Sequence, residues 1–350
     1  MQPELDNRAK QVLKTLVRLY IETGAPVGSR VLARESGLEV SPATIRNIVA
    51  DLEELGLVRS PHTSAGRMPT SRGYRLFVAI MLETRPLGPE EQAQIRESLY
   101  QQASDIYQLY HAAGRLISGH THYVGIVLVP RLGQGRFRQI DFLALAQYRI
   151  LAILVTTTGI VQNRIVELDR TVSESELERA ANYLNERFAG CSLAEVKRLL
   201  AAEKGGQAET LEALAADIGW SALDFEADEE LFVEGQGNLL DYPEFAQSQR
   251  LRELFEVLEE PDEVARVLAD VSDSTGVQLR IGEEMDHAAL EDCSVVTANY
   301  RTEDDGLGTV AVIGPARMNY AATIPFVDCT AQQLSSVLSL NGPPPEQPPF

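Results

Sequence analysis

Residues 41–75 of the chain are SPATIRNIVADLEELGLVRSPHTSAGRMPTSRGYR. Ser41 can cap a helix, and Pro42 suits the first helical position because proline has no N–H to leave unpaired there. Apolar side chains then recur at spacings of three and four up to Gly56, which is the period of one helical face. The sequence therefore predicts an amphipathic helix that begins after Ser41 and ends at Gly56.

The polar face of this predicted helix carries side chains suited to DNA recognition. Arg46 can donate two hydrogen bonds to guanine, and Asn47 can pair with adenine in the major groove. Ser41 and Thr44, at the helix start, are expected to bind phosphate together with the backbone N–H groups there. Any one of these could instead be a solvated surface residue, but the cluster favours a helix that enters the major groove by its N-terminus.

Two further helices precede this one. A helix is predicted over Asp6–Thr23, where Gly24-Ala25-Pro26 stops it, and a short helix follows from Ser29 to Gly37. A short helix joined by a small turn to an amphipathic one is the helix-turn-helix pattern. Because such shapes also occur in protein-binding modules, geometry alone leaves an ordinary three-helix domain as the alternative.

The segment after Gly56 predicts a wing, a β-hairpin beside the recognition helix. Strands are expected at 57–59 and 67–69, and residues 60–66 are dense in turn formers. Thr70 or Ser71 then caps another helix. The wing and this helix supply the remaining predicted DNA contacts: His62, Thr63, Ser64 and Arg67 on the minor groove or backbone, and Arg72 and Arg75 on phosphate.

Charge is unevenly distributed along the 350 residues, although the net charge is −20. Residues 1–85 hold 12 Lys and Arg against 9 Asp and Glu, or +3, which leaves 31 − 12 = 19 against 51 − 9 = 42, or −23, for the remainder. Phosphate attraction is screened over roughly 8–10 Å at ordinary salt, so the local sign matters most. DNA binding is therefore expected only in the N-terminal module.

The sequence predicts a cytoplasmic protein. No apolar run approaches the ~18 residues that span a bilayer, and residues 1–10 lack the apolar core of a signal peptide. The three cysteines are odd in number and far apart, so neither a disulfide framework nor a CxxC metal site is indicated.

The rest of the chain predicts an α+β fold with a helical insertion. A helical stretch is expected at 89–119, a second helical block at about 171–270, and a last helix at 331–338. Strands are expected at 123–129, 137–145, 149–156, 160–168, 277–281, 294–300 and 308–314.

Five segments give a specific resemblance. ETGAPVGSR (22–30), SPATIRN (41–47), LEELG (52–56) and PHTSAGRMPTSRGYR (61–75) resemble the N-terminal domain of the heat-inducible transcription repressor HrcA family, and TVAVIGPARMNY (309–320) is similar to its C-terminal end. This resemblance implies that the split β-rich domain is GAF-like and that the inserted block serves dimerisation.

The expected architecture is thus an α+β multidomain chain, with a winged helix-turn-helix followed by a GAF-like α/β domain that a mostly helical domain interrupts. The expected boundaries are a winged-helix domain at 1–82, a linker at 83–92, the GAF-like domain at 93–170 and 276–340, an inserted dimerisation domain at 171–275, and a disordered tail at 341–350.

Sequence signatures of catalysis are missing. The chain has no P-loop, HExxH or GxSxG motif, so no catalytic residue and no cofactor are predicted. His120 and His122 could share a face and bind metal, but they lack a Cys or carboxylate partner nearby, and no metal site is predicted. Residues 314–320 could line a ligand pocket, although a structural turn into the last helix is favoured.

These features together predict a repressor that binds an inverted repeat in double-stranded DNA as a homodimer. The resemblance implies an operator upstream of chaperone genes, relief by heat, and a GroEL-type chaperonin as the partner that restores activity. Two alternatives stay open. One is a repressor that uses the β-rich domain to sense a small molecule, and the other is an enzyme with a helix-turn-helix docking domain.

Overall fold

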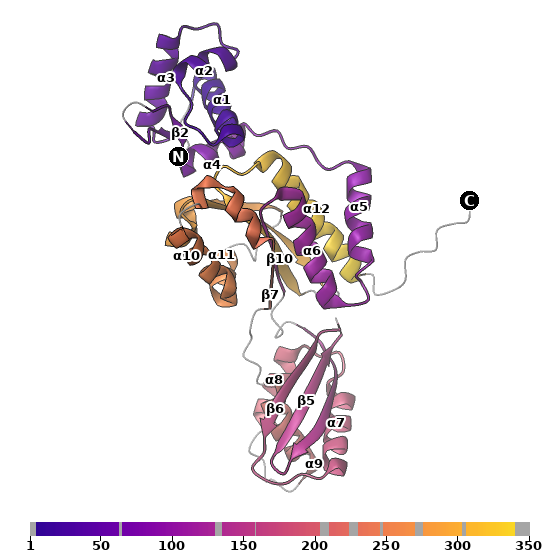
Figure 1. The fold of residues 1–350 in the computed structure, drawn as a ribbon. Helices are drawn as coiled ribbons and strands as arrows, with labels where there is room; N and C mark the ends of the chain where they lie inside the picture. Colours follow the sequence, from indigo (N-terminus) through magenta and orange to yellow (C-terminus); the bar gives the residue numbers. More distant parts are fainter. Residues whose placement is uncertain are drawn as a thin grey trace, which may run out of the picture.

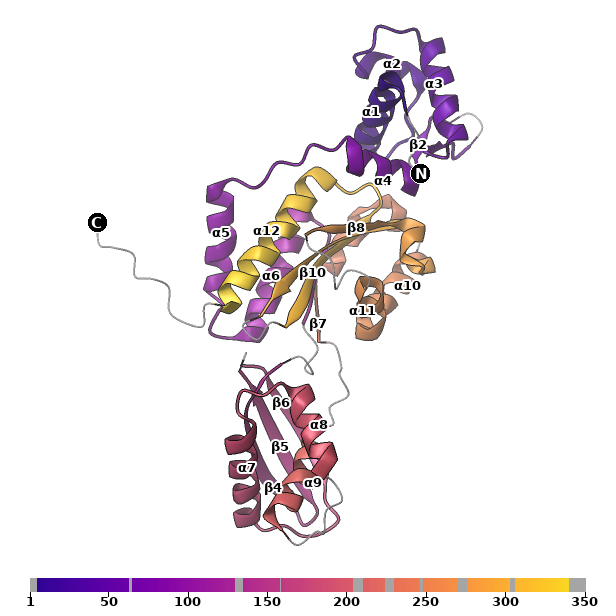
Figure 2. The ribbon, with the colours of Figure 1, turned by 180° about the vertical axis from the view of Figure 1, so that it is seen from behind.

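Three bodies follow one another along the molecule in the computed structural model (Figures 1 and 2). A small helical domain lies at one end, a sheet with helices on both faces lies in the middle, and a three-stranded unit lies at the other end. The structure describes residues 5–62, 65–129, 135–157, 159–203, 210–223, 230–245, 248–269, 276–302 and 306–339.

The N-terminal domain is a winged helix-turn-helix, which confirms the prediction. Its elements are α1 (Asn7–Thr23), α2 (Ser29–Glu35), α3 (Pro42–Glu54), β1 (Val58–Arg59), β2 (Met68–Pro69) and α4 (Ser71–Ile80). Asp6, Ser41 and Thr70 cap α1, α3 and α4 by accepting hydrogen bonds from backbone N–H groups. The wing strands pair antiparallel, and Val27 bridges Arg67 beside them.

The central domain is built on a five-stranded antiparallel sheet in the order β7-β3-β10-β9-β8. The strands are β3 (Val124–Leu128), β7 (Leu231–Glu234), β8 (Gln278–Ile281), β9 (Cys293–Arg301) and β10 (Leu307–Pro315). Val127 and Val312 face a core shared with helices on one side, whereas Ile126 and Ile313 face a second core on the other. Such two-sided burial explains why these strands are almost continuously apolar.

Helices cover both faces of this sheet. One face packs on α6 (Ile106–Thr121) and α12 (Tyr320–Ser339), with α5 (Pro89–Tyr100) outside them, and the other carries α10 (Ser248–Glu259) and α11 (Pro261–Ala269) (Figure 2). Short 3-10 turns complete the domain: η2 (Gln236–Asp241), η3 (Pro243–Phe245), η4 (Gly282–Met285) and η5 (Ala288–Leu290).

A second sheet forms a separate unit with its own core. It contains β4 (Phe137–Ala146), β5 (Arg149–Thr156) and β6 (Val161–Glu167) in that order, covered on one face by α7 (Glu174–Phe188), α8 (Leu193–Glu203) and α9 (Leu211–Leu223). The structure differs here from the expected boundaries, which place residues 93–170 in the GAF-like domain. Buried side chains such as Ile150 and Leu154 pack on the three helices instead, so the insertion begins before β4 and is only partly helical.

Two other predictions differ from the structure. The helical stretch at 89–119 is two helices, because Asp105 accepts hydrogen bonds from the N–H groups of Tyr107 (3.0 Å) and Gln108 (3.2 Å) and starts α6 anew. The last helix begins at Tyr320 rather than near 331. The predicted tail at 341–350 lies outside the described residues.

The ends of the insertion meet on the central sheet. Strand β7 lies inside the block that was predicted to be helical, yet it pairs antiparallel with β3 over Gly125–Leu128. Just beyond that pair, the N–H of Val129 donates to the carbonyl of Glu230 at 2.9 Å. The inserted unit therefore leaves and rejoins the domain at adjacent positions of one hairpin.

One apolar core joins the winged helix to the central domain. A single cluster of buried side chains includes Leu16 of α1, Leu52 of α3, Phe77 of α4 and Phe326 of α12. At the junction the rings of Tyr74 and Tyr320 lie 6.0 Å apart. No helix among the described residues is long and apolar enough to span a bilayer.

Candidate nucleic-acid interface

The N-terminal half of α3 presents two exposed polar side chains without partners in the described part of the chain, Arg46 and Asn47. The Ser41 hydroxyl accepts from the N–H of Thr44 at 3.2 Å and lies 3.0 Å from the Thr44 hydroxyl, which fixes the first turn. Ile45 and Val49 are buried beneath the helix, so Arg46 and Asn47 are exposed on its other side. Neither Arg46 nor Asn47 makes a hydrogen bond or ion pair with the residues that the structure describes.

The start of α3 also suits an anion. Pro42 lacks an N–H, and the helix dipole places partial positive charge at this end. The acidic residues Asp51, Glu53 and Glu54 lie in the last turns, away from it. The helix therefore offers its donors at one end and its carboxylates at the other.

Arg67 is half-buried and is paired within the winged-helix domain. Its Nε and a terminal nitrogen donate to one carboxylate oxygen of Glu53 at 3.0 and 2.9 Å, and another nitrogen donates to the carbonyl of Ala65 at 3.4 Å. The last turn of α3 thus brings a carboxylate within reach of Arg67, and the pair fixes the base of the wing to α3. The DNA contact of Arg67 stays a prediction.

The other wing residues are only partly described. His62 is exposed at the end of β1, and its carbonyl accepts from the Ser60 hydroxyl at 2.6 Å. Thr63 and Ser64 lie outside the described residues.

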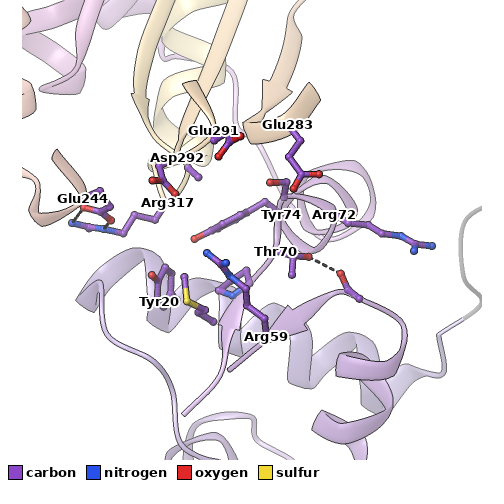
Figure 3. A pocket seen from close by; sticks show the side chains of 15 residues that line it. Tyr20, Arg59, Thr70, Arg72, Tyr74, Glu244, Glu283, Glu291, Asp292 and Arg317 are labelled. Atoms are coloured by element: carbon purple, nitrogen blue, oxygen red, sulfur yellow. Dashed lines mark hydrogen bonds and ion pairs between the residues drawn. The ribbon is translucent and has the colours of Figure 1, made fainter. Parts of the chain in front are cut away.

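The two arginines of α4 point in different directions. Arg72 is exposed and extends away from the body of the protein (Figure 3). Arg75 turns toward the central domain, where its Nε donates to Glu284 at 3.0 Å and a terminal nitrogen donates to the same carboxylate and to the Leu279 carbonyl. Arg75 thus joins the two domains, and its phosphate contact stays a prediction.

The structure therefore brings part of the predicted set together. The start of α3 holds Ser41, Thr44, Arg46 and Asn47, whereas two arginines form ion pairs, Arg67 with Glu53 and Arg75 with Glu284.

Arg317 was not predicted to have a role, although it lies in the 309–320 segment that carries the resemblance. It pairs with Glu244, donates to the carbonyl of Ile21 at 3.4 Å and lies over the Tyr242 ring.

A cavity of about 350 Å³ lies between the winged helix and the central domain (Figure 3). One wall comes from α1, the wing and α4, and the other from η3, η4, the turn after η5 and the turn before α12. Its polar and charged lining side chains are Tyr20, Arg59, Thr70, Ser71, Arg72, Tyr74, Glu244, Glu283, Glu291, Asp292 and Arg317.

The two histidines weighed as metal ligands have separate surroundings. The His120 ring stacks on Phe326 with centroids 3.8 Å apart, and burial lowers the pKa of its imidazole. His122 ends α6 in a left-handed conformation. Among the described residues, no group of three His, Cys, Asp or Glu could hold a metal ion.

Two family models match the chain. Residues 4–82 match the winged helix-turn-helix transcription repressor, HrcA DNA-binding model, and residues 108–324 match the HrcA protein C terminal domain model. Together they cover the winged helix, the inserted unit and most of the central domain.

Relatives and a solved structure match over nearly the full length. The heat-inducible transcription repressor HrcA of Xanthomonas euvesicatoria pv. vesicatoria is 43% identical over 97% of this chain and 98% of its own. Those of Methylobacillus flagellatus (43%, 96% and 99%) and Geobacter sulfurreducens (41%, 96% and 98%) are similar. A crystal structure described as a hypothetical protein at 2.2 Å resolution shares the fold, with a TM-score of 0.57, 23% identity and coverage of 96% and 98%.

Proposed function

The chain belongs to the HrcA family of heat-inducible transcription repressors, and from this premise we propose that it represses chaperone genes by binding an inverted-repeat operator as a homodimer. Its winged helix is a DNA-binding domain. The proposal places the protein with the DNA in the cytoplasm and gives it no catalytic role.

The exposed start of α3 carries the proposal. Arg46 and Asn47 have no partner among the described residues, so they are available to base edges, where each bidentate contact contributes about 1–3 kcal/mol of discrimination. Ser41, Thr44 and Arg72 are proposed to bind phosphate. The wing residues His62, Thr63 and Ser64 are proposed to contact the minor groove or backbone.

Arg67 and Arg75 are proposed to position the other contacts rather than to bind DNA themselves. Arg67 sets the wing against α3 through Glu53, and Arg75 sets α4 against the central domain through Glu284. An arginine already paired with a carboxylate has fewer free N–H donors to offer a phosphate.

The outer face of the β4–β6 sheet supports the homodimer. Leu143, Leu151 and Ile165 lie in one cross-strand row on the side away from α7–α9, and Leu143 and Ile165 are 56% and 48% exposed. Large apolar side chains grouped on an exposed sheet face mark an interaction surface. A second copy of the chain fits because a two-fold axis pairs one patch with itself and provides two DNA-binding domains for two half-sites.

Heat relief is proposed to follow from loss of folded structure. Domains of this size have only about 5–15 kcal/mol of stability, so modest heating can populate inactive forms without a dedicated sensor. A GroEL-type chaperonin is proposed to return such forms to the folded dimer. If operator affinity survives mild heating unchanged without chaperonin, this part of the proposal fails.

Fluorescence anisotropy tests the DNA-binding proposal directly. The full chain is titrated onto a palindromic operator and a scrambled duplex of the same composition, across a series of salt concentrations. Arg46→Ala is expected to weaken operator binding by about 1–3 kcal/mol and leave the scrambled duplex almost unchanged.

Arg72→Ala is the matched control, because it removes an exposed arginine that is proposed to bind only phosphate. It is expected to weaken both duplexes alike and to reduce the salt slope by about one. Equal losses on both duplexes for Arg46→Ala would remove its assigned role in base recognition.

A further inference from the structure

We propose that the cavity between the winged helix and the central domain binds a small oxyanion, a phosphate or carboxylate group, through the Tyr74 hydroxyl and the Arg59 guanidinium. This goes beyond repression, because it assigns the protein a ligand other than DNA. It rests on the unsatisfied polar groups of the cavity and on the directions in which they point.

The Tyr74 hydroxyl is the first of these groups. Tyr74 is 3% exposed and lines the cavity, yet its hydroxyl has no hydrogen-bond partner among the described residues. Buried hydroxyl groups are nearly always paired, since an unpaired one loses its bonds to water without replacement. A ligand oxygen would supply the missing acceptor.

Arg59 is the second group. It lies on β1 at the wing side of the cavity, and its side chain makes no hydrogen bond or ion pair with the described residues. Figure 3 shows its guanidinium and the hydroxyl end of Tyr74 directed into the same part of the cavity, opposite Tyr20 and Arg317. A guanidinium together with phenol hydroxyls forms a donor set suited to phosphate or carboxylate oxygens.

Tyr20 lies beside the same arginines. Burial raises the pKa of Tyr20, and Glu244 raises it further, whereas Arg317 and Arg59 lower it. The Tyr20 phenol therefore lies within the fields of both arginines, and the carboxylate with the largest effect on it is itself paired with Arg317.

The carboxylates of the cavity do not oppose an anion bound by Tyr74 and Arg59. Glu244 is paired with Arg317, and Asp292 is paired with Arg250. Glu283 and Glu291 are exposed, so water and salt screen them. The Tyr74 hydroxyl points away from Glu283 (Figure 3).

A ligand bound in the cavity would affect the position of the DNA-binding domain. Arg59, Tyr20 and Tyr74 come from the winged helix, while Arg317 comes from the central domain. Since the cavity exists only when the two domains are docked, a ligand bound in it favours the docked arrangement.

Thermal melting of the full-length protein tests this site without DNA, so its failure and a failure of DNA binding are separate results. Inorganic phosphate and malonate are the probes, each titrated against chloride at constant ionic strength. The melting temperature is expected to rise with the logarithm of probe concentration for phosphate, malonate or both, and the more effective probe identifies the group. No rise with either probe overturns the proposal.

Two variants locate the binding site. Tyr74→Phe removes only the unpaired hydroxyl and keeps the ring in the core, so it should fold and melt at or above the wild-type temperature. Tyr74→Phe and Arg59→Gln are both expected to abolish the probe-induced rise. If the rise persists in either variant, the proposal is wrong.

Two further variants control for binding elsewhere. Arg46→Gln removes a charge from the proposed DNA surface, and Arg198→Gln removes one from the exposed face of α8. Both should retain the full probe-induced rise. Loss of the rise in Arg46→Gln would place the anion on the DNA-binding surface and overturn the assignment to the cavity.

Discussion

Three buried ionisable side chains are expected to make the stability of the protein fall in alkali. Burial, with a smaller contribution from Glu244, raises the pKa of the Cys293 thiol to about 12, and burial also raises the pKa of Tyr300 and Tyr320. In the unfolded chain these groups titrate near ~8.5 and ~10. A group with a raised folded-state pKa stabilises the fold below its unfolded pKa, and this contribution is lost as pH rises toward the folded value.

We therefore expect the free energy of unfolding to be steady from pH 7 to 8 and to fall above about pH 9. Urea denaturation across this range measures it. Cys293→Ala should make the decline between about pH 8.5 and 10 shallower, because the tyrosines titrate only above that interval. A stability that stays flat to pH 11 would contradict the buried, protonated state of these groups.

Two helical glycines should respond oppositely to the same substitution. A Cβ on Gly73 would overlap the carbonyl oxygen of Leu57, which accepts from the N–H of Thr70 at 3.1 Å, whereas a Cβ on Gly119 would meet nothing within 4 Å. Gly73→Ala is expected to cost about 1–3 kcal/mol, because α4 must move away from the wing. Gly119→Ala should stabilise α6 by up to about 1 kcal/mol. Urea denaturation of both variants measures the change in the free energy of unfolding. If Gly73→Ala leaves this free energy unchanged, the close approach of α4 to Leu57 is not required for stability.

Sequence patterns predicted the exposed face of α3 but not the partners of the arginines. Ser41, Pro42 and the apolar period placed Arg46 and Asn47 correctly on an exposed face, since all of that information is local. Arg75 looked equivalent to Arg72, yet its carboxylate partner lies 209 residues away in the sequence. A single sequence contains no local signal for such a pair.

Single elements were predicted better than their assembly into sheets. The short apolar run at 149–156 predicted a strand, and the structure has β5 there with Ile150, Ala152 and Leu154 buried. Such a run does not say which sheet receives a strand, so the prediction placed β4–β6 in the wrong domain. Strand β7 was missed because four residues, LFVE, stand within a largely helical block.

The exposed face of β4–β6 gives a prediction for this element. Leu143→Glu places a charge in the middle of the proposed dimer surface and should convert dimer to monomer, because burying an unpaired carboxylate is costly. Analytical ultracentrifugation measures the change, and operator affinity should fall with it.

Leu240→Glu provides the matched control. Leu240 is 67% exposed, more than Leu143, but lies in η2 of the central domain. This variant should remain dimeric. If Leu143→Glu also remains dimeric, the dimer forms through another surface.

At the scale of the whole molecule, two arginines join the winged helix to the central domain, Arg75 through an ion pair and Arg317 through a hydrogen bond. Arg75 pairs with Glu284, and Arg317, paired with Glu244, also reaches the carbonyl of Ile21 in α1. The first pair is partly exposed, so it should stabilise the protein by only about 0.5–1 kcal/mol. Its main effect is on the orientation of α4.

Arg75→Ala and Glu284→Ala should therefore change operator affinity by the same factor, and the double variant should change it no further. A positioning role predicts this coupling because either variant breaks the same contact. A loss confined to Arg75→Ala, with a reduced salt slope, would show instead that Arg75 binds DNA phosphate. Anisotropy titrations of the three variants separate these outcomes.

The hairpin stem formed by β3 and β7 makes the inserted unit removable. Val129 and Glu230 are joined by a backbone hydrogen bond, so the two ends of the insertion are as close as the ends of a tight turn. A chain in which Asn-Gly replaces everything between them would keep the central sheet while losing the proposed dimer surface. Such a minimised repressor would bind one half-site at a time, and its affinity relative to the parent would measure the avidity that the second subunit supplies.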